Sequence, residues 1–364
     1  MISRNKTFDF LRVIAALAVV FGHSYELLGA SASLRGGDPL SIHTRLNTFA
    51  GCGVIMFFAI SGYWITQSAE RATSWLDFAW RRALRILPGL WVMLVLSVLV
   101  LGPLETSLSF ANYILAYKTR EYLQGFFLYL RDGLPGVFEN NPHTSTVNGS
   151  LWTLRLEVKC YLLVSLLLIV PRRTRAFVAA FLVILAIYLA ARHVFWRPFK
   201  VPFFRENSAV TVFALTAFFT GVSVCRFRWE AYCKYHGWAA LLTVTLLAGY
   251  FVPQHDKLLA WVFTFALSLT TLGVGLHWAH ESVDRVMKGD ISYGLYLYAF
   301  PIQQTILAHH LRVDPLTLFV ATLVFLAPLA AFSWVYVEKP MLAERNWFAR
   351  RRETLVSNEE SVHA

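Results

Sequence analysis

The residues best suited to chemistry lie in the first hydrophobic segment, Phe8–Gly29, which reads FDFLRVIAALAVVFGHSYELLG. This segment is long enough to cross a bilayer as one helix, yet it contains four ionisable residues, Asp9, Arg12, His23 and Glu26. Near the membrane centre such side chains cost about 2.5–3.5 kcal/mol each. Arg12 and His23 are three helical turns apart, so they share one face at a separation of roughly 16 Å. We predict that this face lines a reaction chamber.

A carboxylate in the segment GSLWTLRLEVKCYL is the second candidate catalytic residue. Glu157 lies about seven residues into a predicted helix that enters from the side where His23 lies. Equal depth allows the two side chains to meet, and a carboxylate can fix the tautomer of an imidazole that accepts a proton. Two alternatives stay open: a buried polar pair that only locks helix packing, and Glu26 as the partner of His23.

A basic stretch, SWLDFAWRRALRILP, forms a second constellation of Arg81, Arg82 and Arg85. Guanidinium groups bind phosphate oxygens well, so this cluster could hold a phosphorylated co-substrate beside the first helix. The alternative is a role in topology and lipid-headgroup contact. We expect an interfacial segment whose apolar residues lie against lipid: Trp75, Phe78, Leu84 and Leu87.

Four further residues are candidates for contact with a carbohydrate. Asn148, Ser150 and Trp152 are predicted at the mouth of the chamber, and Tyr293 belongs to the aromatic segment SYGLYLYAFPI. The alternative for Trp152 and Tyr293 is an ordinary packing or interface role. The spacing of His and Cys residues does not suggest a metal site, and we expect the four cysteines to be packing residues.

Composition indicates the elements that must position these residues. The chain has 364 residues, of which 57% are hydrophobic, and successive apolar runs predict an all-α, polytopic membrane bundle. About ten spans are expected: 8–29, 49–68, 88–104, 151–170, 176–195, 208–225, 237–252, 258–278, 291–310 and 316–337. Residues 105–149 are expected to form an interfacial or re-entrant insertion within a membrane domain 1–340, followed by a short tail, 341–364.

The net charge of +11 lies mainly in the segments between the apolar runs. Cationic loops at the cytoplasmic membrane surface explain it better than nucleic-acid binding, and the bias predicts that both termini are cytoplasmic. Residues Arg192, Arg197, Lys200 and Arg205 would then lie outside, where they could serve an anionic acceptor unless a nearby span is misplaced.

Six segments in order resemble the signature segments of acyltransferase family 3: FDFLRVIAALAVVFGH, FFAISGYWI, RRALRILP, NGSLWTLRLEVKCYLL, ISYGLYLYAFPI and VEKP. The resemblance implies a ten-helix enzyme of the bacterial inner membrane that moves an acetyl group from acetyl-CoA, as co-substrate, to a sugar hydroxyl of a surface or exopolysaccharide. It implies that His23 is catalytic and that Arg12 and the arginine cluster handle acyl-CoA. The implied partners are acetyl-CoA, a carbohydrate acceptor, the lipid bilayer and polysaccharide-assembly proteins.

Two positions depart from the family pattern. Ala299 occupies a position where relatives often have histidine, and Arg155 occupies one where exopolysaccharide members often have proline. No second catalytic histidine is therefore expected in that segment, and the helix that carries Glu157 is expected to enter without a kink.

Several mechanistic and functional alternatives stay open. His23 could act as a general base for direct transfer or form an acetyl-imidazole intermediate. The competing functions are a proton-coupled transporter with Arg12, His23 and Glu157 as its relay, and a non-catalytic scaffold for polysaccharide assembly.

Overall fold

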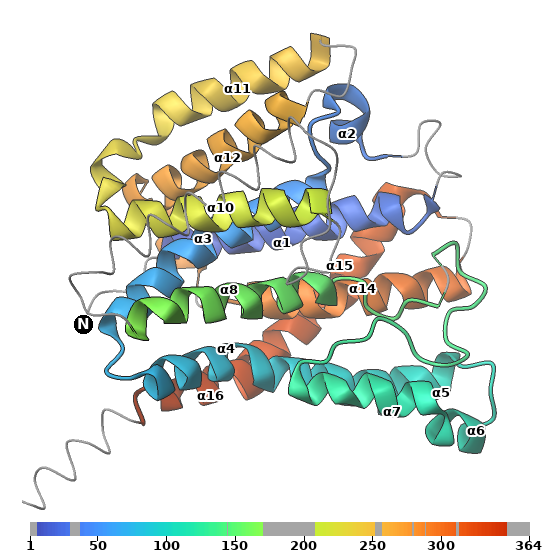
Figure 1. Cartoon of the computed structure of the whole chain (residues 1–364). Coiled ribbons are helices and arrows are strands. Elements are labelled where there is room, and N and C mark those ends of the chain that lie inside the picture. The colour runs from blue at the N-terminus through green and yellow to red at the C-terminus, as the bar shows by residue number, and fades with distance from the viewer. Residues whose placement is uncertain are drawn as a thin grey trace, which may run out of the picture.

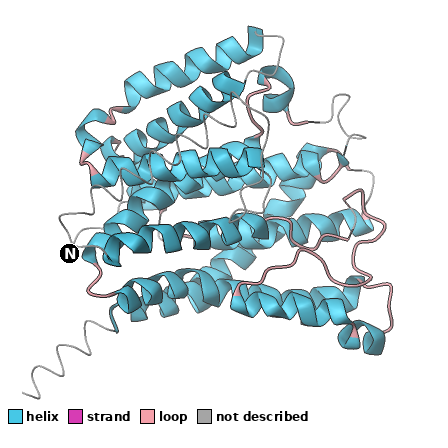
Figure 2. Cartoon of the chain, in the orientation of Figure 1, coloured by secondary structure: helices cyan, strands magenta, loops and turns pink. Residues whose placement is uncertain are grey.

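The structure is a computed structural model that describes residues 6–29, 37–143, 145–169, 208–251, 257–278, 280–287, 289–310 and 313–347. Within these ranges the chain consists of helices and loops, and strand-like pairing is limited to one isolated bridge between Thr106 and Val137 (Figure 2). The all-helical class predicted from the sequence is confirmed for the described residues.

The helices are numbered along the chain (Figure 1). Their bounds are α1 Lys6–Glu26, α2 Pro39–Thr44, α3 Phe49–Arg71, α4 Trp75–Leu96, π-helix η2 Ser97–Leu101, α5 Gly102–Glu105, α6 Phe110–Leu115, α7 Tyr117–Leu123, 3₁₀ helix η3 Gln124–Phe127, α8 Leu151–Ile169, α10 Ser208–Arg226, 3₁₀ helix η4 Trp229–Tyr232, α11 Tyr235–Phe251, α12 Lys257–His277, α13 Glu281–Val286, α14 Ser292–His309, α15 Pro315–Ser333, π-helix η5 Trp334–Glu338, α16 Lys339–Ala343 and 3₁₀ helix η6 Glu344–Asn346.

Five helices in the described residues are long and apolar enough to cross a membrane, which makes this a multi-pass membrane protein. They are Lys6–Glu26, Phe49–Arg71, Trp75–Glu105, Lys257–His277 and Pro315–Ala343. The last two lie close to their predicted positions, although the final helix continues past the predicted end at Val337. The predicted span 176–195 and the cationic positions Arg192, Arg197, Lys200 and Arg205 lie outside the described residues.

The basic stretch is not a separate interfacial segment, so that prediction was wrong. Residues Trp75–Glu105 form one continuous helix of 31 residues that passes through Pro88. Phe78 and Leu84, predicted to lie against lipid, are only 2% and 4% exposed because they pack inside the protein. A single proline removes one backbone donor, and long helices accommodate this where neighbouring helices pack around them. The arginines therefore lie within the bundle.

Small residues allow the central helices to approach each other closely. A Cβ atom built on Gly62 of α3 would lie 2.0 Å from the carbonyl oxygen of Phe218 on α10, and one on Gly221 of α10 would lie 2.2 Å from that of Ala59. On its other side, α3 meets α1, where a Cβ on Gly53 would lie 2.3 Å from the Ala15 carbonyl oxygen. Small residues such as Gly62 in the FFAISGYWI segment therefore permit this close packing.

The helices are arranged around α3, which contacts α1, α8, α10 and α12 (Figure 1). In this view α11 and α12 lie along one edge of the bundle, and α4 with α16 lies along the opposite edge. Helix α14 packs against α1, α4 and α15, so it connects the first helix with the arginine-bearing helix.

Two consecutive, fully buried glutamines on α14 fix the positions of α1 and of the loop 131–150. The Gln303 amide donates to the Val20 carbonyl (2.9 Å) and to Ser24 Oγ (2.8 Å) on α1. The Gln304 amide donates to the carbonyl oxygens of His143 (2.8 Å) and Thr146 (2.7 Å). One helix thus holds both α1 and the described residues of the loop 131–150, and it satisfies two carbonyl oxygens of this partly exposed loop.

Candidate active site

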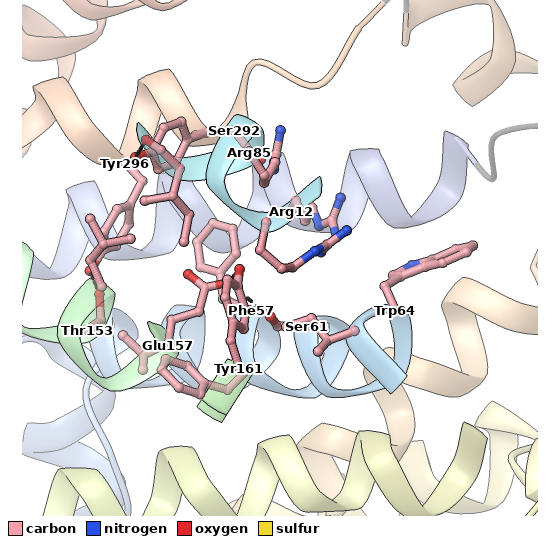
Figure 3. Close-up of a pocket in the computed structure, with 17 residues that line it drawn as sticks. Arg12, Phe57, Ser61, Trp64, Arg85, Thr153, Glu157, Tyr161, Ser292 and Tyr296 are labelled. Carbon is pink, nitrogen blue, oxygen red and sulfur yellow. Dashed lines mark hydrogen bonds between the residues drawn. The ribbon is translucent and has the colours of Figure 1, made fainter. Parts of the chain in front are cut away.

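Arginines from two helices converge on one cavity inside the bundle (Figure 3). Arg12 comes from α1, and Arg82 and Arg85 come from α4, where the spacing of three residues places them on one face. The cavity encloses about 100 Å³. Its polar lining is completed by Ser61, Thr153, Glu157, Tyr161, Ser292, Tyr293 and Tyr296.

A buried carboxylate just before α14 holds two of these arginines. One oxygen of Asp290 lies 3.2 Å from Arg12 Nη1 and 2.7 Å from Arg85 Nη2, and the other accepts hydrogen bonds from the backbone and hydroxyl of Ser292. Asp290 is only 2% exposed. Glu338, equally buried, lies 3.9 Å from Arg85 Nη1. The network ties α1, α4, the start of α14 and the end of η5 together.

The substitution Asp290→Asn is expected to destabilise the protein strongly. Removing one partner of a buried ion pair leaves uncompensated charge, which typically costs about 3–5 kcal/mol. Thermal unfolding of the detergent-solubilised protein measures this loss. The matched control is Asp284→Asn, whose carboxylate lies 3.9 Å from Lys6 Nζ with 65% of its side chain exposed and should contribute little. Equal melting temperatures for the two variants would contradict the structural role of Asp290.

The three arginines of α4 do not act as one cluster. Arg81 points away from the cavity, and its Nε donates to Asp77 on the same helix at 2.8 Å. Arg82 lines the cavity and donates to Ser68 Oγ at 3.3 Å, and its guanidinium carbon lies 5.9 Å from the centre of the Tyr161 ring. Its buried Nε has no hydrogen-bond partner among the described residues, and no carboxylate there forms an ion pair with it. Of the predicted trio, the structure brings only Arg82 and Arg85 together with Arg12.

Glu157 forms part of this cavity and does not form the predicted pair with His23. Its Oε1 accepts hydrogen bonds from Ser61 Oγ (3.0 Å) and Tyr161 OH (2.6 Å). His23 has a different environment: its Nε2 lies 3.9 Å from Glu26 Oε2, and its ring meets the edge of Phe300 at a centroid distance of 5.3 Å.

The reason for this difference is the depth at which α8 begins. Asn148, just before α8, donates to the Leu297 carbonyl at 2.9 Å, and Tyr296 OH donates to the Ser150 carbonyl at 2.9 Å. Helix α8 therefore starts inside the bundle and not at its outer surface. Glu157 consequently lies near Tyr293 and Tyr296, whereas His23 lies near Phe300, which is about 10 Å further along α14 than Tyr293.

The candidate carbohydrate-binding residues lie in several places. Asn148 and Ser150 are 0% and 2% exposed, and both polar groups of the Asn148 side chain bind protein: its amide donates to Leu297, and its oxygen accepts from the Ser150 backbone. Neither residue is exposed, Ser150 Oγ has no hydrogen-bond partner among the described residues, and contact of either residue with a carbohydrate stays a prediction. Trp152 packs against the core. Tyr293 lies in the arginine cavity, donates to the Ile86 carbonyl (2.7 Å) and has Arg85 over its ring at 5.7 Å.

The two departures from the family pattern have simple structural counterparts. Ala299 is buried, and the next residue, Phe300, is the one that meets His23. Helix α8 is continuous from Leu151 to Ile169, and Arg155 on it donates to the Leu130 carbonyl at 3.1 Å.

Sequence reasoning missed Asp290, Ser61, Tyr161 and the two glutamines as parts of the site. Asp290 immediately precedes the ISYGLYLYAFPI segment, and its acidic side chain at the start of an apolar run was a usable signal. The glutamines were equally visible as adjacent amides inside the same run. Their partners lie more than 150 positions away in the chain, so the pattern alone could not identify them.

These features define an integral-membrane protein: an all-helical, multi-pass bundle with an arginine-lined cavity, and with His23 outside that cavity on the helix that carries Arg12. The family model of the acyltransferase domain, acyltransferase family 3, matches residues 5–337, and the chain belongs to this family. It is therefore an acyltransferase.

Two curated relatives cover almost the whole chain. The "O-acetyl transferase" of Shigella phage Sf6 is 29% identical over 354 residues, which is 93% of this chain and 96% of the relative. "Nodulation protein 10" of Rhizobium leguminosarum bv. viciae is 30% identical over 370 aligned positions, which is 96% of each chain. No solved structure shows significant similarity to the chain.

Proposed function

We propose that this protein transfers an acetyl group from acetyl-CoA to a sugar hydroxyl of a bacterial surface polysaccharide or exopolysaccharide, or of its lipid-linked precursor. The proposal places it in the inner membrane with ten spans and with both termini cytoplasmic. Polysaccharide-assembly proteins are its proposed partners. The printed name of the phage relative, an O-acetyl transferase, supports the acetyl group.

The observation that carries the proposal is the convergence of Arg12, Arg82 and Arg85 on one cavity. Acetyl-CoA is a polyanion, and guanidinium groups bind phosphate oxygens through paired, charge-assisted hydrogen bonds. Arg12 pairs with Asp9 and Asp290, and Arg85 pairs with Asp290 and Glu338, whereas Arg82 pairs with no carboxylate in the described residues. Arg82 is therefore the proposed primary contact for an anionic group of the donor.

His23 is the proposed general base. It shares the Arg12 face of α1, so a thioester arm that extends from the arginine cavity along α1 leads toward the imidazole. Within the described residues its buried Nδ1 has no hydrogen-bond partner, which leaves that nitrogen available to a substrate. Glu157 would act from the cavity, where it balances positive charge, and would not orient His23.

The chemical step needs no other group. The acceptor hydroxyl gives its proton to His23 as its oxygen forms a bond to the acetyl carbon. The carbon–sulfur bond then breaks, and the proton passes from His23 to the sulfur to give free coenzyme A. Direct transfer of this kind needs only a positioned base, typically worth about 10²–10⁴-fold.

The test uses the full-length protein purified in detergent with radiolabelled acetyl-CoA and de-O-acetylated surface polysaccharide from the source cells. Label is expected to appear on the polysaccharide as alkali-labile acetyl ester, with one free thiol released for each ester formed. Transport of a solute in proteoliposomes without acetyl-CoA, and no thiol release with it, would favour the proton-coupled transporter instead.

A further inference from the structure

A second histidine shares the outer end of the site with His23. The Phe300 ring contacts two imidazoles in a T-shaped, edge-to-face geometry. The centroid distance and interplanar angle are 5.3 Å and 80° for His23, and 6.0 Å and 75° for His143. The two histidines are far apart in the sequence, one on α1 and the other on the loop 131–150. A single aromatic side chain of α14 thus brings them into one cluster.

The position of His143 is fixed by the backbone of its loop and not by its side chain. Its carbonyl oxygen accepts from the Gln304 amide at 2.8 Å, and the Asn141 amide donates to the Gln304 carbonyl at 2.8 Å. Further along the same loop, a Cβ built on Gly149 would lie 2.8 Å from the Phe300 ring, so the backbone rests on that ring. The backbone therefore fixes the position of the imidazole, and among the described residues no hydrogen bond occupies its nitrogens.

Among the described residues, neither nitrogen of the His143 imidazole has a hydrogen-bond partner, and the residue is only half-buried. The ring packs on Phe300 but makes no hydrogen bond among the described residues, so its two nitrogens can bind a ligand. A neutral imidazole can donate through one nitrogen and accept through the other, which suits an alcohol that does both.

The two ends of the site differ in charge. The arginine cavity around Tyr293 and Tyr296 suits the anionic donor. Among the described residues, the His23–His143–Phe300 cluster forms no ion pair or cation–π contact with an arginine or lysine, and its one ion-pair partner is Glu26, whose side chain is 60% exposed. A neutral polyol is better suited to the second end than a polyphosphate.

We propose that His143 binds the acceptor: it hydrogen-bonds a sugar hydroxyl and orients it so that His23 can take its proton. This inference rests on the proposed function. His143 changes neither its bonds nor its protonation in the step, because the proton leaves the hydroxyl for His23 and ends on the sulfur of coenzyme A. It lowers the barrier by holding the attacking oxygen in place.

The experiment measures donor and acceptor kinetics separately for His143→Ala, with acetyl-CoA and with de-O-acetylated surface polysaccharide from the source cells. Loss of one hydrogen bond is expected to raise the KM for the polysaccharide by about 3- to 10-fold. The KM for acetyl-CoA should stay at the wild-type value. His143→Gln, whose amide also donates and accepts, should recover most of the acceptor affinity.

The matched control is His310→Ala, because His310 is an exposed histidine just after the end of α14. It should leave both KM values unchanged. Equal KM values for wild type and His143→Ala would overturn the inference, as would a parallel rise in both KM values without rescue by His143→Gln. If the wild-type protein releases thiol but acetylates no polysaccharide, the proposed function is wrong about the acceptor. The role of His143 then fails because of the acceptor, and not because of the kinetics of the His143→Ala variant.

Discussion

His23→Ala is expected to reduce acetyl transfer by about 10²–10⁴-fold, the usual value of a positioned general base. The variant should still fold, because α1 is held at this depth by the Gln303 amide, which donates to the Val20 carbonyl and to Ser24 Oγ. The imidazole takes no part in these hydrogen bonds. The measurement is the rate of acetyl ester formation by the purified variant, alongside its melting temperature.

Binding of coenzyme A provides the control for this prediction. The arginine cavity lies away from His23, so the variant should bind coenzyme A as tightly as the wild type. Substantial remaining transfer by a folded His23→Ala protein would remove His23 from the mechanism. If labelled acetyl accumulates on wild-type enzyme without acceptor and is absent from the variant, the acetyl-imidazole route would replace direct transfer.

Arg82→Ala is expected to raise the KM for acetyl-CoA by roughly 10- to 100-fold, because a hydrogen bond to a charged group contributes about 1.5–3 kcal/mol. Since Arg82 forms no ion pair with a carboxylate in the described residues, its removal breaks no internal salt bridge, and kcat and stability should change less than KM. Steady-state kinetics with purified protein measure the effect.

The neighbouring Arg81 is the matched control. Arg81→Ala removes the same charge from the same turn, but its guanidinium is paired with Asp77 outside the cavity. The KM for acetyl-CoA should therefore be close to that of the wild type. Because Asp77 is buried, this variant is expected to lose stability, and its KM is measured on protein shown to be folded. Equal effects of the two substitutions on this KM would favour the alternative role of these arginines in membrane topology and lipid-headgroup contact. Arg85→Ala is less informative, because Arg85 also holds Asp290 and its loss would disturb the fold.

The geometry also bears on the proton-coupled transporter. A relay through Arg12, His23 and Glu157 needs neighbouring groups, but Arg12 pairs with Asp290 and Glu157 accepts from Ser61 and Tyr161. His23 lies at a different depth, beside Phe300. The three residues belong to two separate environments, which suits a donor end and an acceptor end better than a continuous proton path.

The sequence could predict much of this architecture because the controlling forces are local. A segment such as Phe49–Arg71 must be helical in lipid, since only a helix satisfies its own backbone there. Charged residues in an apolar run, such as Arg12 and His23, must face protein for the same energetic reason. Gly62 and Ser61 could likewise be expected at a close helix contact, which the structure confirms for Gly62 against α10.

The errors arose where depth and continuity depend on distant parts of the chain. Pro88 was expected to begin a span, but packing on both sides allows the helix to continue through it. Residues 105–149 were expected to form an interfacial or re-entrant insertion, but no local pattern showed that the Asn148 amide binds the Leu297 carbonyl and that the Gln304 amide binds the Thr146 carbonyl. Helix α8 begins at Leu151, as predicted, but this residue lies inside the bundle, and that depth separates Glu157 from His23.

The sequence by itself determined the class of the protein, its membrane-spanning character and the residue types that can do chemistry, because hydropathy and the cost of buried charge act on each segment separately. Only the tertiary structure decided which of those residues meet: Arg82 and Arg85 with Arg12, Glu157 with Ser61, and His23 with Phe300 and His143. These meetings depend on hydrogen bonds and ion pairs between residues far apart in the chain, such as that of Arg12 with Asp290, and no local pattern encodes such partners.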